Sequence, residues 1–196
     1  MFPERLETER LTFERLTREG IDVRTLYRIC SADPDIDEVT RYVTWDPHET
    51  VKETAEFVDR AVTGWEDDET ATYVVRPREG EDGAGEIAGL TSLDCDWDRR
   101  TGNLGMWLRK RYWGRGYSGE RAEALLAIAF ETLELEVVAV THHADNEKSR
   151  RAIEKYVEAH GGRREGLLRN WISHGAEVAD EYRYTISREE YREARS

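Results

Sequence analysis

The spacing of hydrophobic and polar residues divides the first third of the chain into one strand and several helices. Residues 10–16 (RLTFERL) alternate in the manner of a half-buried strand, whereas Ile21, Leu26 and Cys30 recur at helical spacing within 20–32. Helical patterns continue in IDEVTRYV at 36–43 and ETVKETAEFVDRAV at 49–62.

The middle of the chain changes to strand patterns separated by short turns. Strands are predicted at 70–77, 85–98 and 101–109. The glycine-rich, charged segment RPREGEDGAGE at 76–86 is typical of a hairpin loop, and the connection DWDRRTGN is short and rich in turn residues. These features predict an antiparallel meander.

Helices and strands alternate in the last third. An amphipathic helix is predicted at 119–133, a strand at 136–143 and a helix at 146–160 that Gly161 and Gly162 would end. Strands at 163–169 and 176–186 precede a short helix with Ser187 as its N-cap. The whole order predicts an α+β fold rather than a doubly wound sheet, and 196 residues suit one domain over 1–196.

Composition excludes several classes of function. The net charge of −13 argues against nucleic acid as a partner, because phosphates would be repelled. The acids are spread along the chain, which favours an acidic surface adapted to a salty cytoplasm over steering of a cationic substrate. No apolar run could span a bilayer and the charged N-terminus has no signal-peptide core, so we expect a soluble, cytoplasmic protein without a membrane partner.

Two cysteines give no sign of a metal or redox site. Cys30 and Cys95 belong to no C-x-x-C pair, and we expect two reduced thiols.

The stretch YWGRGYSGE at 112–120 contains three glycines, Gly114, Gly116 and Gly119, which spell G-x-G-x-x-G. A dinucleotide-binding fingerprint needs a strand running directly into the first glycine, but RKRYW intervenes here, and the acids near residue 135 precede the next strand instead of ending it. A P-loop would need G-K-[ST], which is absent.

Starting at Arg111, the same stretch spells R-x-x-G-x-G at the start of a helix. Such a loop leaves backbone N–H groups free where the helix dipole favours an anion, and Arg111 and Arg115 could add charge-assisted bonds. The residues thus predict a pyrophosphate site, with a glycine-rich helix start that binds nothing as the alternative.

The segment LGMWLRKRYWGRGYSGERAEALLAIAF resembles the acyl-CoA-binding segment of the GNAT N-acetyltransferase superfamily. The segments NEKSRRAIEK and RREGLLRN are similar to the branch that contains ribosomal-protein N-terminal serine and alanine acetyltransferases. The resemblance covers about residues 5–191. It implies a mixed sheet of about seven strands that splays open in the middle, with helices on both faces.

The resemblance also implies a site for acetyl-CoA as co-substrate, and no metal. Pantetheine would pair with Met106, Trp107 and Leu108, and Asn146 would touch its arm. The same position of Asn146 is equally typical of a helix N-cap, and both roles are compatible. Ser149 would lie near the sulfur and could protonate it. The pyrophosphate would be held by the amides of 111–118, among them those of Arg111, Gly114, Arg115, Gly116, Tyr117 and Ser118.

The implied reaction is direct attack of a neutral amine on the thioester, with a backbone N–H near Trp107 or Leu108 for the oxyanion. Ile153 replaces a tyrosine acid of many relatives, and EKYVEAHGG replaces the usual EK-x-G-F. Asn103 occupies the catalytic position where the branch often has a glutamate, and asparagine cannot be a base. The base is left open among His142, His143, Asp94, Asp96 and Glu69.

Three functions follow as alternatives: acetylation of a protein N-terminus, acetylation of a small amine such as a polyamine or aminoglycoside, or binding of acyl-CoA without turnover. A monomer and a homodimer are both compatible with the sequence. The six tryptophans are expected in the core or in groove walls, with Trp113 under the glycine loop. Trp171 is expected in the core, and the wall of an acceptor channel is the alternative.

Overall fold

The computed structural model describes residues 1–174 and 177–196. Its first part comprises β1 (Arg5–Glu7), β2 (Leu11–Arg15), α1 (Val23–Ala32), α2 (Ile36–Thr40) and α3 (Val51–Glu66). The middle comprises β3 (Thr70–Pro77), β4 (Gly89–Asp96) and β5 (Thr101–Leu108), followed by a short 3₁₀ turn and α4 (Tyr117–Ala127). The last part comprises β6 (Val137–His143), α5 (Glu147–Ala159), β7 (Arg163–His174), β8 (Glu177–Ser187) and α6 (Arg188–Ala194).

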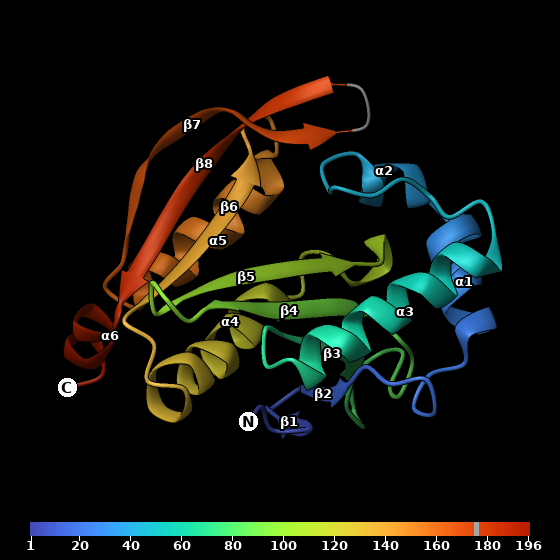
Figure 1. Cartoon of the computed structure of the whole chain (residues 1–196), viewed down its shortest axis with the longest axis horizontal. Helices are drawn as coiled ribbons and strands as arrows, with labels where there is room; N and C mark the ends of the chain where they lie inside the picture. Colours follow the sequence, from blue (N-terminus) through green and yellow to red (C-terminus); the bar gives the residue numbers. More distant parts are fainter. Residues whose placement is uncertain (175–176) are drawn as a thin grey trace.

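All eight strands of the described chain join one mixed sheet in the order β1-β2-β3-β4-β5-β6-β8-β7 (Figure 1). The predicted α+β class is confirmed, whereas the expected number of seven strands is one too few. The missed strand is β1, which has only three residues, Arg5–Glu7, at the edge of the sheet. So short a segment shows no period of its own, and only its pairing with β2 defines it.

Two hydrophobic cores hold helices against the two faces of the sheet. The larger lies between the sheet and α4 and α5, and contains Tyr73, Leu93, Leu125 and Ile153. The smaller lies under α1 and α3 and contains Leu26, Val58, Val74 and Leu90. In Figure 1, α1 and α3 are seen on one face of the sheet and α4 on the other.

Local signals fixed most of the helix ends. Gly161 has a φ of +77° after α5, and the Gly162 N–H donates to the Val157 carbonyl, as expected of a glycine C-cap. Ser187 and Glu190 form a capping box at α6.

Several boundaries differ from the prediction. β7, predicted at 163–169, runs to His174, and α3, predicted at 49–62, spans Val51–Glu66. The strand predicted at 85–98 spans only Gly89–Asp96, because residues 85–88 belong to the preceding loop. The helix predicted at 119–133 begins at Tyr117 and passes into one π turn at Ile128–Thr132. The strand predicted at 176–186 is observed as Glu177–Ser187, and its first predicted residue, 176, lies outside the described residues.

The sheet divides in the middle. β5 pairs with β4 along its whole length, but its parallel pairing with β6 covers only Thr101–Asn103 against Val137–Ala139. Beyond Asn103 the two strands part, and their diverging ends form what we call the fork (Figure 1). The predicted splay between these strands is thus present.

Candidate active site

The glycine loop after β5 presents a row of free backbone donors. In the described part of the chain, the N–H groups of residues 114–118 donate to no protein acceptor. Gly114 and Gly116 have φ values of +75° and +80°, a conformation that glycine adopts without strain. Gly116 is the N-cap of α4, so these amides lie at the positive end of a helix.

The third glycine of the motif has a different property. A Cβ atom built on Gly119 would meet no atom within 4 Å, so the start of α4 faces open space. In a dinucleotide-binding fingerprint, the third glycine allows close packing of helix against strand. Gly119 makes no such contact here, which agrees with the conclusion from the sequence that the motif is not a dinucleotide-binding fingerprint.

The loop is anchored from the other end of the sequence. The Glu120 carboxylate accepts hydrogen bonds from the Thr8 hydroxyl at 2.5 Å and from the Arg10 N–H at 2.7 Å. Burial raises the pKa of Glu120, but these bonds and the Arg10 guanidinium outweigh it, and the net pKa is lowered. Arg10 also donates to the Arg115 carbonyl at 2.8 Å. The connection between β1 and β2 therefore holds the loop and the start of α4 in place.

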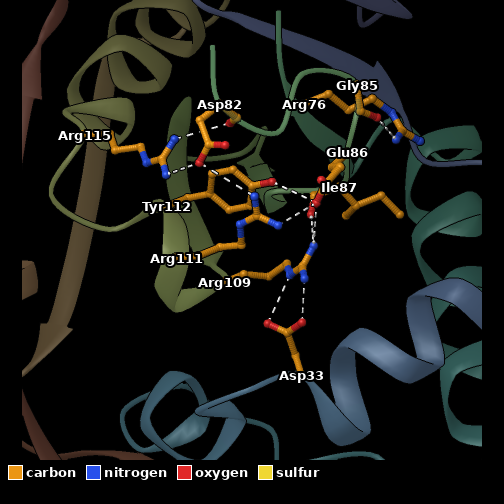
Figure 2. A network of polar contacts seen from close by, with 10 residues as sticks. All are labelled: Asp33, Arg76, Asp82, Gly85, Glu86, Ile87, Arg109, Arg111, Tyr112 and Arg115. Carbon is orange, nitrogen blue, oxygen red and sulfur yellow. Dashed lines mark hydrogen bonds and ion pairs between the residues drawn. The ribbon is translucent and has the colours of Figure 1, made fainter.

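The arginine side chains of the motif are already paired with carboxylates. Figure 2 shows Arg111 and Arg115 directed at the loop between β3 and β4. Arg115 bonds Asp82 at 2.8 Å, and Arg111 bonds Glu86 at 2.9 Å. The guanidinium of Arg115 lowers the pKa of Asp82. The expected role of both arginines toward a phosphate stays a prediction, and the free donors are those of the backbone.

Two further arginines near the loop were not singled out from the sequence. Arg109 forms a bidentate pair with Asp33, at 2.6 and 3.0 Å, that joins the end of β5 to the end of α1 (Figure 2). Arg121 is 3% exposed in α4, and its Nε and Nη1 have no acceptor in the described part of the chain. Nothing in the spacing of charges along the sequence marks either residue.

The edge of β5 that faces the fork carries the three residues expected to pair with pantetheine. Met106 packs against the larger core and Trp107 against the smaller one. The Leu108 carbonyl accepts a hydrogen bond from the Trp113 indole N–H at 2.8 Å. This bond, together with packing of Trp113 on the larger core, confirms that Trp113 lies under the glycine loop.

The start of α5 closes the opposite side of the fork. Asn146 is the N-cap, and its Oδ1 accepts the Ser149 N–H at 3.0 Å, so the capping role expected for it is present. Ser149 is half-buried and lies one turn before Ile153, which is 6% exposed in the core. Residues at this spacing share a helix face, so Ser149 faces the sheet.

The candidates for the base occupy different places. His142 is 5% exposed and packs between Tyr182 and Tyr184, and burial lowers its pKa. His143 contacts the Tyr42 ring, 5.0 Å between centroids, where the segment after α2 meets the end of β6. Asn103 is exposed at the fork. Asp94 lies opposite it on β4.

One aromatic prediction is wrong. Trp171, expected in the core, is 58% exposed. It sits at an irregularity between Leu168 and Ile172 on β7, where the pairing with β8 shifts, so its side chain leaves the regular alternation. The sequence around it, LRNWISHG, shows no sign of this shift.

Across residues 1–174 and 177–196, no group of three or more His, Cys, Asp or Glu side chains is placed to hold a metal ion. None of the helices described is long and apolar enough to cross a membrane.

Comparisons with known proteins agree with this geometry. Residues 10–156 match the family described as "Acetyltransferase (GNAT) domain". "Uncharacterized N-acetyltransferase p20" of Bacillus licheniformis is 24% identical over 188 residues, 96% of this chain and 98% of the relative. "Putative ribosomal N-acetyltransferase YdaF" of Bacillus subtilis is 36% identical over 93 residues, and the match spans 46% of this chain and about half, 50%, of the relative.

A solved structure shares the fold. The Microcin C7 self immunity acetyltransferase MccE, solved in complex with acetyl-CoA and AMP, superposes with a TM-score of 0.79 at 15% identity, covering 95% of this chain and 97% of that one. The match over residues 10–156 extends from β2 through α5 and includes the fork and the glycine loop. The chain therefore belongs to the GNAT acetyltransferase family and is an acetyl-CoA-dependent N-acetyltransferase.

Proposed function

We propose that the acetyl acceptor is the N-terminal α-amino group of a protein. The observation that carries this proposal is an exposed apolar surface on the β7–β8 hairpin, beside the fork. Leu167, Trp171 and Val178 are 41%, 58% and 58% exposed. Residues 178–180 of β8 extend past the last pair with β6, His143 with Glu181. Such a surface suits the side chains of a peptide better than a small polar amine.

The chemistry of the acceptor supports the same choice. An α-amino group has a pKa near 8, so a useful fraction is neutral at physiological pH, whereas alkyl amines like that of lysine have a pKa above 10. The site has Asn103 where relatives of the same branch often carry a glutamate. Because asparagine cannot take a proton from the ammonium, this position favours the acceptor whose amine has the lower pKa. The name of YdaF, a ribosomal N-acetyltransferase, points in the same direction.

The co-substrate would occupy the fork with its phosphates at the glycine loop. The free N–H groups of 114–118 would donate to the pyrophosphate, and the open space at Gly119 leaves room for it. The edge of Met106–Leu108 would pair with the pantetheine amides, and the Asn146 side chain, which caps α5 through Oδ1, still has its N–H₂ to donate. Ser149 would hydrogen-bond the departing sulfur.

The acceptor is tested by thiol release from acetyl-CoA, in molar KCl because the surface is acidic. Peptides beginning with Ser, Ala and Met are compared with the same peptides blocked at the N-terminus, and with spermidine and an aminoglycoside. We expect kcat/KM to be at least tenfold higher for a free peptide N-terminus than for any small amine. Equal or faster turnover of a small amine would replace the proposal by the small-amine alternative.

Trp171→Ala tests the surface that carries the argument. We expect KM for the peptide to rise several-fold while the acetyl-CoA affinity stays constant, because Trp171 lies on the hairpin and not on the glycine loop. Lys52→Ala, an exposed change on α3, is the matched control. An unchanged KM for the peptide in Trp171→Ala would show that the hairpin surface does not bind the acceptor peptide.

A further inference from the structure

A row of paired residues crosses four strands and ends at the fork. Thr70 on β3 pairs with Asp94 on β4, Asp94 pairs with Asn103 on β5, and Asn103 pairs with Ala139 on β6. Directly paired residues point to the same face of a sheet, with Cβ atoms about 5 Å apart. Asn103 with Ala139 is the last pair before β5 and β6 diverge. The Asp94 carboxyl therefore lies one strand away from the apex of the fork.

The row faces the side of the sheet covered by α1 and α3. Two rows farther along β5, Val74, Leu90 and Trp107 belong to the smaller core on that face. Because side chains alternate with a period of two, Asp94 and Asn103 lie on the same face. Ser149 approaches the fork from the α5 side of the sheet, so Asp94 and Ser149 flank it from opposite faces.

Asp94 is held in one orientation by two hydroxyl groups. The Thr70 Oγ1 donates to Asp94 Oδ1 at 2.9 Å, and the Ser92 Oγ donates to Oδ2 at 3.0 Å. Gly105, opposite Ser92, makes this possible, because a Cβ at that position would approach the Ser92 Oγ to 2.6 Å. Each carboxylate oxygen keeps a second lone pair for another donor.

The surroundings of the Asp94 carboxyl raise its pKa above the ordinary value. Burial raises its pKa, and the hydrogen bonds from Thr70 and Ser92 offset that rise only in part. A carboxylate with a raised pKa accepts a proton more readily than an exposed one. Asn103, directly opposite Asp94 on β5, is exposed and uncharged.

We propose that Asp94 is the general base of the acetyl transfer, and that it supplies from β4 the carboxylate that Asn103 cannot supply from β5. The Asn103 carbonyl oxygen accepts a hydrogen bond from the substrate ammonium and orients it. This inference rests on the acetyltransferase activity and on the fork as its site, and holds for either class of acceptor amine.

The step balances without a further reactant. One proton of the acceptor ammonium passes to the Asp94 carboxylate, and the nitrogen lone pair attacks the thioester carbonyl carbon. The C–N bond forms and the C–S bond breaks, with its electron pair leaving on sulfur. The second amine proton ends on that thiolate, and Asp94 returns its proton to solvent.

Other ionisable groups surround Asp94 and set the controls. Asp96 follows on the same strand face, and Cys95 points to the opposite face with its pKa raised to about 12, first by burial and then by Asp94. The connection from α3 to β3 contributes Asp67, Asp68 and Glu69. The partners from β3, β5 and β6 in the same row, Thr70, Asn103 and Ala139, carry no charge. His143 lies farther along β6, past the fork apex.

The first test is Asp94→Asn with the best acceptor of the peptide and amine panel. We expect kcat to fall by about 10²- to 10⁴-fold, the usual range for loss of a general base. Acetyl-CoA affinity by calorimetry should stay within twofold, which separates this result from a failure of the co-substrate site. Activity of the variant should rise with pH until the amine itself is neutral. Asp98→Asn, an exposed change in the turn after β4, is the control and should keep wild-type kcat.

The second test moves the pKa without removing the carboxyl. Thr70→Val deletes a hydrogen bond to the charged form of Asp94, which raises its pKa and should shift the acidic limb of kcat/KM to higher pH. A purely structural role of Asp94 would lower activity without moving that limb. The proposal is overturned if Asp94→Asn, folded by circular dichroism, keeps kcat within twofold, or if the limb is the same in Thr70→Val and wild type.

Discussion

The two sides of the fork are built from different parts of the chain and different chemistry. The proposed phosphate side is one continuous stretch, residues 111–120, whose free groups are the backbone amides around Gly114 and Gly116. The proposed acceptor side draws single side chains from separated segments: Tyr42 after α2, Asp94 and Asn103 on two strands, and Trp171 on β7. One side is a local motif, and the other exists only once the sheet has formed.

This difference predicts how each side responds to mutation. A backbone site depends on the φ angles and on free space, so it is sensitive to any side chain that replaces a glycine. A side-chain site depends on the placement of distant elements, so it is sensitive to the ties between them. The predictions below alter one side at a time.

The largest effect is expected for Gly116→Glu. The φ of +80° strains any L side chain, and the new carboxylate would compete for the amides of 114–118. Loss of two charge-assisted hydrogen bonds corresponds to roughly 100-fold or more in affinity. Calorimetry with acetyl-CoA measures this loss of affinity.

Gly80→Glu is the matched control for that experiment. Gly80 has a φ of +97° and open space around it, so the control adds the same charge and a similar strain in the β3–β4 loop instead of in the glycine loop itself. We expect it to bind acetyl-CoA like the wild type. Equal losses in the two variants would mean that strain or charge, rather than the amides, explains the result.

The same contrast explains how much could be predicted from the sequence. Glycines at fixed spacing before a helical pattern are a signal contained in neighbouring residues. The loop, its helix and the caps at Gly161 and Ser187 were therefore predicted close to their observed positions. The exposed Trp171 was missed because a register shift in a strand depends on the partner strand. The edge strand β1 was missed for a related reason, since three residues carry no periodicity.

The site residues divide in the same way. The resemblance to a family predicts roles for Asn146 and Ser149 toward the co-substrate, and the structure confirms the expected N-cap role of Asn146, whose side chain accepts the Ser149 N–H. By contrast, the sequence did not decide which residue is the general base. Nothing in it indicates that Asp94 pairs with Asn103, or that Thr70 and Ser92 both donate to the Asp94 carboxyl. The pairing register of the strands brings together residues that are far apart in the sequence, and one amino-acid sequence alone does not reveal that register.

An intermediate effect is expected for Asp33→Asn, which removes the salt bridge between Asp33 at the end of α1 and Arg109 at the end of β5. The Asp33 and Arg109 side chains are only 10% and 15% exposed, and removal of one partner of a buried pair costs several kcal/mol. Glu86 remains near Arg109 at 3.5 Å, so we expect a loss of about 2 kcal/mol, measured by urea unfolding.

The kinetic consequence of Asp33→Asn sharpens the comparison. Asp33 ends α1 and leads into α2, on the acceptor side, so KM for the acceptor should rise more than the dissociation constant of acetyl-CoA. Asp37→Asn, an exposed change in α2, is the control and should leave both unchanged. An equal rise of both constants would show that the two sides are not separate.

The smallest effect is expected for Gly119→Ala, and it tests the open space itself. The new Cβ would meet no protein atom within 4 Å, and alanine stabilises a helix by about 0.5–1 kcal/mol relative to glycine. The free enzyme should therefore unfold at slightly higher urea. If phosphates fill that space, the same methyl group should weaken acetyl-CoA binding a few-fold, so stability and affinity would change in opposite directions. Gains in both would place the phosphates elsewhere on the loop, because a methyl group that improves the helix and leaves binding intact cannot stand where the ligand does.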